Sequence, residues 1–375
     1  MADLTAALHR LPTPRCAYLY DTDVLRARAG QLRAAVPPRT TLLYAVKANG
    51  HPDVVRTMAQ QCDGLEVASG GELALAVTAG ADRIVFGGPA KTDTELTAAL
   101  KAGALLNVES PHELRRLAAL GANTDICLRV NRAEGSLTGS HTMTGTPTPF
   151  GIDETQLPSV LADIPPGLRV IGFHLHAVSN NLDGPAHAAF LTDAIDWSLK
   201  TAFSYDIPLR VVNAGGGLGV DYLTDASIDL TPLSSVQVPD GVELILEPGR
   251  WLAADAGWYA TEVLDLKTTH GRTFAVLRGG THHFRLPAAW GYSHPFQIIP
   301  IDEWPHPYPR LQVTDTPVDA VGELCTPRDV LTRNQHVPRL RTGDLLVFPR
   351  AGAYGWDISH HDFLRHDPPT FLTLP

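Results

Sequence analysis

The stretch that decides the fold starts with TLLYAV (41–46) and GLEVAS (64–69), which the helical pattern GELALAVTAGA (71–81) follows. Short apolar runs and helical patterns alternate in this way to about residue 250. The remaining runs are RIVFGG (83–88), ALLNVES (104–110), DICLRVN (125–131), LRVIGFHL (168–175), LRVVNAG (209–215) and VELILEP (242–248). Eight strands that alternate with helices predict an α/β protein with a (β/α)8 barrel. An open, doubly wound sheet can also reach this number of strands and is the alternative.

The sequence pattern changes after residue 250. Runs such as WYATEVLDLKTT, RTFAVLRGG and GDLLVFPRAGAY alternate with Gly, Pro and Asp turns, and long helical patterns stop. We therefore expect a barrel over residues 22–250 and an all-β domain over residues 251–375. The extended run AYLY (17–20) precedes the barrel, so residues 1–21 are expected to complete the β-domain.

Composition and charge exclude several classes of protein. The 375 residues, 44% of them hydrophobic, suffice for about two or three domains, and 32 glycines and 30 prolines argue against a helical bundle. A net charge of −10 without a Lys/Arg run argues against nucleic-acid binding, and no apolar run approaches the roughly 18 residues of a membrane span. The first residues lack the apolar segment of a signal peptide, and the four scattered cysteines form no disulfide pattern. These observations predict a soluble, cytoplasmic protein.

Chemically useful residues follow three of the predicted strands. Lys47 comes after the first strand, the glycine run NAGGGLG (213–219) ends the seventh, and EPGR (247–250) ends the eighth. Active sites of such barrels lie at the C-terminal ends of the strands, often with a phosphate site after strands seven and eight. A phosphate site beside an amine is typical of a Schiff-base aldolase or of an enzyme that uses pyridoxal 5'-phosphate (PLP).

Six motifs, taken together, resemble a known family. They are YAVKAN (44–49), FHLHAVS (173–179), NAGGGLG, EPGR, GELC (322–325) and GAYG (352–355). Their order is similar to that in the fold-type III PLP-dependent decarboxylases, which include ornithine, arginine and diaminopimelate decarboxylases. The resemblance implies a barrel of alanine-racemase type, a C-terminal β-domain, PLP as cofactor and a homodimer with shared active sites.

The resemblance also implies roles for individual residues. Lys47 matches the lysine that carries PLP, His176 matches a histidine that stacks on its ring, and Glu247 matches the acid at its pyridine nitrogen. Glu66 lies where relatives usually have Asp, and Cys325 matches a proton-donating cysteine from the opposite subunit. The positions that match other cofactor contacts, mostly to the phosphate, are Ser179, Gly215, Gly216, Gly217, Gly249, Arg250 and Tyr354.

Glu247 also favours decarboxylation on chemical grounds. A carboxylate keeps the pyridine nitrogen protonated, and a protonated ring is a strong electron sink for the carbanion that remains when CO2 departs. Racemases that resemble this fold typically place an arginine there.

Two segments depart from the better-known members of the family. Diaminopimelate decarboxylases read C-E-S-x-D where this chain reads CTPRD (325–329), so Thr326 replaces a glutamate that binds the distal end of the substrate. The segment HFRLPAAW (283–290) is also unusual, although its Arg285 aligns with an arginine that holds a substrate carboxylate. Thr326, Asp329 and Arg285 are therefore the candidate substrate residues. Both segments resemble the siderophore-biosynthesis branch, which decarboxylates conjugates such as citryl-diaminopropionate.

Other functions remain open at this point. A diaminopimelate or other free amino-acid decarboxylase is one alternative, and a non-catalytic PLP-binding protein is another. Histidines at 282, 283, 360, 361 and 366 suggest a metal, but no set of partners is arranged around them, so we expect none.

Overall fold

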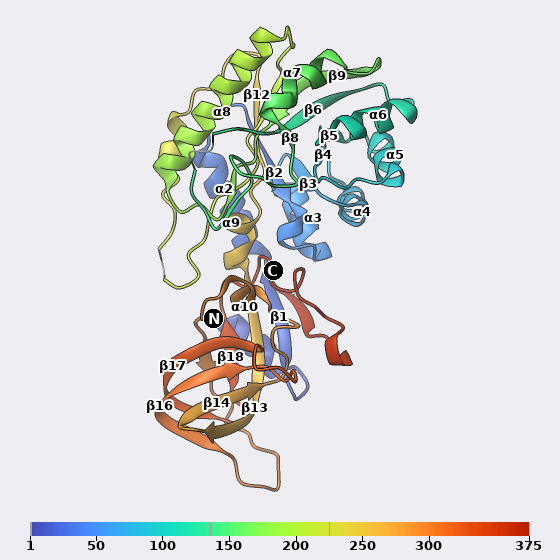
Figure 1. Cartoon of the computed structure of the whole chain (residues 1–375). Helices are drawn as coiled ribbons and strands as arrows, with labels where there is room; N and C mark the ends of the chain where they lie inside the picture. The colour runs from blue at the N-terminus through green and yellow to red at the C-terminus, as the bar shows by residue number, and fades with distance from the viewer. Residues whose placement is uncertain (1, 135–136, 225, 375) are drawn as a thin grey trace. The chain divides into compact units, whose positions relative to one another are not determined.

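The computed structural model describes residues 2–134, 137–224 and 226–374, and these divide into two compact units. Residues 25–221 and 226–252 form one unit, which is called the barrel unit here. Residues 2–24, 222–224 and 253–374 form the other, called the β-unit. Figure 1 shows the elements of each.

The barrel unit contains a closed barrel of eight parallel strands. Along the chain they are β2 (Thr40–Ala45), β3 (Gly64–Val67), β4 (Ile84–Phe86), β5 (Leu105–Val108), β6 (Thr124–Asn131), β9 (Leu168–His174), β11 (Val211–Asn213) and β12 (Glu243–Leu246). Each pairs with its neighbours in parallel, and the pairing of β5 with β6 closes the ring. All eight predicted strands are confirmed, and closure excludes the open sheet.

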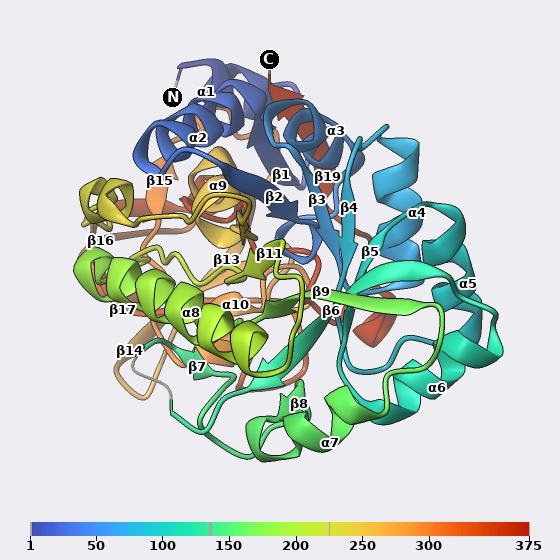
Figure 2. The same cartoon turned by 90° about the horizontal axis from the view of Figure 1, so that it is seen from above.

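Helices surround the strands on the outside (Figure 2). They are α2 (Thr22–Ala35), α3 (Pro52–Gln61), α4 (Gly70–Thr78), α5 (Asp93–Lys101), α6 (Pro111–Ala119), α7 (Leu157–Ala162) and α8 (Gly184–Ser204), while the short helix α9 (Arg250–Ala253) follows the last barrel strand. Three of them begin after a Ser or Thr whose hydroxyl accepts the N–H of a glutamate three residues later, which satisfies a backbone donor that the helix leaves unpaired. These N-cap residues are Ser69, Thr92 and Ser110.

The inside of the barrel is packed with apolar side chains. Leu43, Val85, Cys127, Ile171 and Ile245 belong to one buried cluster, to which six of the eight strands contribute. A filled interior leaves the strand ends as the place for polar side chains.

The β-unit is built on a sheet of eight strands. They are β1 (Cys16–Asp21), β13 (Gly257–Thr269), β14 (Arg272–Leu277), β15 (Gln297–Ile299), β16 (Gln312–Val321), β17 (Val330–Arg341), β18 (Leu345–Phe348) and β19 (Thr370–Leu374). β1 pairs with β13 in antiparallel fashion and with β19 in parallel. Two short helices, α1 (Ala2–His9) and α10 (Leu286–Trp290), accompany the sheet. The β-rich architecture after residue 250 was predicted, but the long strand β17 was not.

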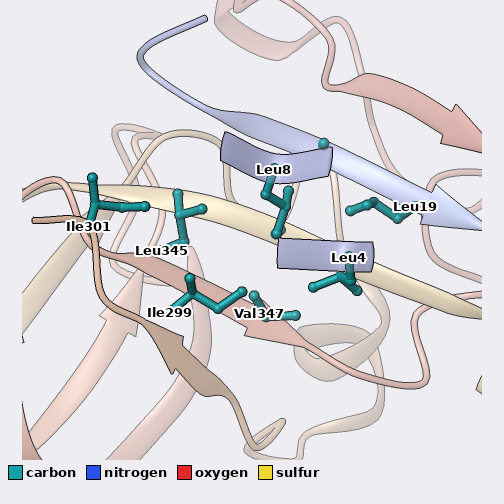
Figure 3. Close-up of a cluster of buried hydrophobic side chains, with 9 residues drawn as sticks. Leu4, Leu8, Leu19, Ile299, Ile301, Leu345 and Val347 are labelled. Atoms are coloured by element: carbon teal, nitrogen blue, oxygen red, sulfur yellow. The ribbon is translucent and has the colours of Figure 1, made fainter. Parts of the chain in front are cut away.

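Helix α1 covers part of this sheet. Figure 3 shows Leu4 and Leu8 of α1 beside Leu345 and Val347 of β18, and all four side chains are buried. Burial contributes roughly 1.5–3 kcal/mol for each of these side chains, so Leu4 and Leu8 help to hold α1 on the sheet.

Two further observations concern the whole described chain. No helix among the described residues is long and apolar enough to cross a membrane. The four cysteines are free thiols: Cys16 and Cys127 are buried, Cys62 is half-buried and Cys325 is exposed.

Candidate active site

Lys47 lies at the C-terminal end of the barrel, in a single 3-10 turn (Val46–Ala48) that directly follows β2. Its Nζ donates a hydrogen bond of 2.7 Å to Oε2 of Glu66 in the adjacent strand β3. The lysine side chain is 42% exposed, whereas that of Glu66 is 4% exposed. The amine is therefore held in place by a buried carboxylate and stays accessible to a ligand.

Glu247 is a second buried carboxylate, placed one residue beyond β12. Its Oε1 accepts a hydrogen bond of 2.6 Å from Nδ2 of Asn213, and its Oε2 lies 3.4 Å from Nε2 of His174. Burial by itself would raise the pKa of Glu247, but the attraction of His174 and Lys47 and the hydrogen bond from Asn213 outweigh it and lower the pKa to about 2. Glu247 is thus an anion over the whole ordinary pH range.

The segment that carries Glu247 approaches the segment that carries Lys47 very closely. The N–H of Ala45 donates to the carbonyl oxygen of Pro248 at 3.3 Å. A Cβ atom on Gly249 would lie 2.8 Å from Cβ of Ala48, so a side chain at this position would push the two segments apart. Glycine at 249 is therefore required to bring Glu247 and Lys47 into one site.

The two carboxylates influence each other. Burial raises the pKa of Glu66, the nearby Lys47 lowers it, and the negative charge of Glu247 raises it again. The net effect raises the pKa of Glu66, whereas the pKa of Glu247 is lowered. Lys47 therefore shares this end of the barrel with one carboxyl group whose pKa is lowered and one whose pKa is raised.

The glycine run after β11 forms a tight loop against His176. Gly215 and Gly217 have φ values of +69° and +108°, which side-chain-bearing residues rarely adopt. The N–H of Gly216 donates to Nδ1 of His176 at 3.1 Å, so the proton of the neutral imidazole is on Nε2. Burial and the nearby Arg129 and Lys47 lower the pKa of His176 well below its usual value. The imidazole ring of His176 is therefore neutral, so its charge would not oppose a flat ligand that stacks on it.

The loop offers donors for an anion. No hydrogen-bond acceptor for the N–H of Gly217, nor any partner for the Ser179 hydroxyl, occurs among residues 2–134, 137–224 and 226–374. A Cβ atom on Gly217 would lie 2.9 Å from the carbonyl oxygen of Val178, which shows how closely the loop follows the segment before Ser179. Arg250 is buried immediately after Gly249. A buried arginine and donors without acceptors fit the phosphate of PLP, and Glu247 fits its pyridine nitrogen.

The remaining predicted residues lie in the β-unit. Cys325 is exposed in the turn before β17, and Thr326 is half-buried beside it. Asp329 is buried, and its carboxylate accepts the N–H groups of Thr281 at 2.6 Å and Leu324 at 2.8 Å. The contacts of Asp329 hold the turn that carries Cys325 and Thr326 against the segment before α10. The role of Asp329 as a substrate residue stays a prediction.

Arg285 and Tyr354 are the other two predicted residues of this unit. Arg285 is exposed at the start of α10, where its backbone N–H donates to the hydroxyl of Ser359 at 3.0 Å. Tyr354 is half-buried and has a φ of +54°, so the GAYG segment turns sharply at the tyrosine. Their roles as substrate and cofactor residues also stay predictions.

Two residues of the barrel site had no predicted role. His174 and Asn213 are the last residues of β9 and β11, and both lie against Glu247. Asn213 also accepts the N–H of Gly215 at 2.9 Å, so it connects the carboxylate to the glycine loop. A search for polar residues that end barrel strands would have found both.

Known proteins are similar to this chain in sequence and in fold. The pyridoxal binding domain of pyridoxal-dependent decarboxylases matches residues 22–254. The chain is 40% identical to 2-[(L-alanin-3-ylcarbamoyl)methyl]-2-hydroxybutanedioate decarboxylase of Staphylococcus aureus, over 96% of this chain and 94% of the relative. It is 33% identical to diaminopimelate decarboxylase of Deinococcus radiodurans, over 98% and 92% of the two chains. The crystal structure of diaminopimelate decarboxylase from Helicobacter pylori with L-lysine matches with a TM-score of 0.86 and 26% identity, over 99% of this chain and 94% of that one. The protein therefore belongs to the pyridoxal-dependent decarboxylases, enzymes that use PLP as their cofactor.

Proposed function

We propose that this enzyme removes the α-carboxylate of a diamino acid that is linked through its side-chain nitrogen to citrate, a step in siderophore biosynthesis. The observation that carries the proposal is the 40% identity, over nearly the whole chain, to the Staphylococcus aureus enzyme. The name of that enzyme's substrate describes an alanine whose C3 bears an amide nitrogen and whose acyl part is a hydroxy-dicarboxylate. Such a molecule combines an α-amino acid with two further carboxylates and a hydroxyl.

The residues of the barrel unit support the decarboxylation step. PLP, when bound, supplies an electron sink for the electron pair that remains on the α-carbon when CO2 departs. Lys47 would hold the cofactor through its accessible amine, and the neutral ring of His176 would lie against the cofactor ring. The anionic Glu247 would keep a proton on the pyridine nitrogen, and Asn213 and His174 would hold that carboxylate in place.

The phosphate of the cofactor would be bound by the glycine loop and its neighbours. The N–H of Gly217 and the hydroxyl of Ser179 would donate hydrogen bonds, while Arg250 would supply a positive charge. Gly215 and Gly216 would act through shape, because a Cβ atom on either would clash with His176 or with the backbone of Glu247. We assign Tyr354 to the same phosphate on the family resemblance alone.

The homodimer and the proton donor are also part of the proposal. We propose that Cys325 is contributed by one subunit to the site of the other, where its thiol returns a proton to the α-carbon. The exposed position of Cys325 in the β-unit supports this role, because a thiol that acts across an interface has to reach the surface of its own chain. A cytoplasmic location fits the four free thiols.

A comparison of substrates tests the proposed function. The purified enzyme with PLP would be incubated with citryl-2,3-diaminopropionate, with free 2,3-diaminopropionate and with diaminopimelate, and CO2 release would be measured. We expect release from the conjugate at a kcat/KM far above that for either free amino acid. The second candidate, diaminopimelate decarboxylase, is favoured by the 33% identity to the Deinococcus radiodurans enzyme. Faster release from diaminopimelate would establish that candidate instead.

A further inference from the structure

The β-unit contains a cavity of about 620 Å3. Its walls come from the segment around α10, from the turn that follows Cys325 and from the start of β17. Its polar lining includes Thr281, Arg285, Ser293, Thr326, Arg328 and Arg333. A cavity of this size holds a small organic molecule rather than a single ion.

The charge of the cavity is the opposite of that of the chain. Arg285, Arg328 and Arg333 all line it, and no Asp or Glu is among the lining residues. The protein as a whole has 40 acidic and 30 basic residues. A cavity lined by three arginines and by no acidic residue therefore differs in charge from the rest of the protein.

These arginines also lack the partners that other arginines of the β-unit have. Seven others among the described residues of the β-unit form ion pairs with Asp or Glu: Arg15, Arg272, Arg278, Arg310, Arg341, Arg350 and Arg365. Within the described ranges, no carboxylate lies within 4.0 Å of the side-chain nitrogens of Arg285, Arg328 or Arg333. Positive charges that line one cavity without a carboxylate partner attract an anionic ligand.

The backbone at each of these arginines is fixed by a hydroxyl group. The N–H of Arg285 donates to Ser359, that of Arg328 to Thr326 at 3.3 Å and that of Arg333 to Ser293 at 3.1 Å. The side chains of Thr326 and Ser293, together with that of Thr281, also line the cavity. The cavity thus combines three arginines, whose backbone is anchored, with several hydroxyl-bearing residues, which matches a ligand that bears carboxylates and a hydroxyl.

We propose that this cavity binds the hydroxy-dicarboxylate end of the substrate, and that Arg328 and Arg333 determine the preference for a citryl conjugate over a free amino acid. The proposal rests on the proposed function for the identity of the substrate. Arg285 is the arginine that the family resemblance already assigned to a substrate carboxylate, whereas Arg328 and Arg333 had no assigned role. Two arginines beyond Arg285 suit a substrate that carries more carboxylates than a simple amino acid does.

The kinetics of arginine variants test this assignment. Arg328→Ala and Arg333→Ala should each raise KM for the citryl conjugate by about 10–100-fold, since a hydrogen bond to a charged group is worth that much in affinity. We expect little change in kcat, in bound PLP or in the slow turnover of free 2,3-diaminopropionate. Arg339→Ala is the matched control. Arg339 is an exposed arginine in the same strand as Arg333, β17, and it does not line the cavity. Arg328→Lys and Arg333→Lys should recover part of the loss.

Direct binding separates this inference from the proposed function. Citrate would be titrated into the PLP-loaded wild-type enzyme and the variants by calorimetry. If Arg328→Ala or Arg333→Ala weakens the binding of citrate, the result supports the cavity assignment. This holds even if the natural substrate proves to be a different hydroxy-dicarboxylate conjugate. Turnover of the conjugate with an unchanged KM in both Ala variants would overturn the assignment and leave the proposed function standing. Absence of citrate binding together with turnover of diaminopimelate alone would overturn both.

Discussion

At the scale of single residues, the barrel site depends on how buried charges are paired. Lys47 is held by Glu66, whereas Glu247 is held by Asn213 and His174, so the two carboxylates have different tasks. This separation agrees with a site in which one group carries the cofactor and another sets the charge of its ring.

Replacement of Lys47 tests the first of these tasks. Lys47→Ala should remove the visible absorbance of lysine-bound PLP, because the amine at the end of β2 is lost. Borohydride reduction of the wild type followed by peptide mapping should place the label on Lys47. Lys101→Ala, at an exposed lysine of α5, is the control and should keep both signals. A label on another lysine would contradict the assignment.

Replacement of Glu247 tests the second task, which is to set the charge of the cofactor ring. Glu247→Gln should retain PLP and yet lower kcat by about 10²–10³-fold, a typical cost of losing one transition-state stabiliser. The amide keeps the size of the side chain and can still pair with Asn213, so a fall in kcat with normal cofactor content isolates the effect of charge. Near-normal turnover of this variant would mean that ring protonation does not depend on Glu247.

The same carboxylate links stability to pH. A group whose pKa is lower in the folded than in the unfolded protein stabilises the fold at pH values above its pKa in the unfolded state. This contribution to the free energy of unfolding is lost as the pH drops to the pKa of the group in the folded state. For Glu247 this window runs from about pH 4.5 down to about pH 2. The free energy of unfolding of the wild type, measured with urea, should therefore fall more steeply in this window than that of Glu247→Gln. Parallel pH profiles would show that the group is not strongly acidic.

At the scale of elements, the loop after β11 has to be made of glycine. A Cβ atom on Gly216 would lie 2.5 Å from the carbonyl oxygen of Glu247, and this backbone oxygen cannot move aside as the end of a flexible side chain could. Gly216→Ala should therefore weaken PLP binding by displacing the loop, which can be measured as cofactor lost on dialysis. Gly30→Ala within α2 is the control, since no atom lies within 4 Å of the added Cβ, and it should bind PLP normally. Equal retention of PLP by both variants would contradict the tight loop.

The elements also show what the sequence could and could not predict. The barrel strands are short apolar runs between turn residues, and their number and order predicted the barrel, although only the pairing of β5 with β6 excludes the open sheet. Strand β17 was missed because its exposed face carries charged residues and Pro338, which hide the alternation of an edge strand. His174 and Asn213 could have been found as polar residues that end barrel strands, but not as the partners of Glu247. Asn213 lies opposite Ile245 in the pairing of β11 with β12, so its contact with Glu247 depends on a register that only the closed barrel fixes.

At the scale of the whole molecule, the candidate residues are divided between two compact units. Lys47, Glu247 and the glycine loop belong to the barrel unit, whereas Cys325, Arg285 and the charged cavity belong to the β-unit. This division is compatible with the shared site proposed above, in which each subunit would supply its barrel unit to one site and its β-unit to the other. The arrangement becomes testable by mixing two variants that are inactive for different reasons.

Complementation of Lys47→Ala by Cys325→Ala is the expected outcome of such mixing. In a random mixture about half of the dimers are heterodimers, and each has one site with an intact Lys47 and an intact Cys325. The mixture should therefore reach at most roughly a quarter of wild-type activity, measured as CO2 release after subunit exchange. Mixing Lys47→Ala with Glu247→Ala is the control, because both residues belong to the same unit and no heterodimer regains a complete site. If Cys325→Ala alone is nearly as active as the wild type, the thiol is not the proton donor. If it is inactive and mixing restores nothing although exchange has occurred, Cys325 acts within its own chain, and the shared-site arrangement is wrong.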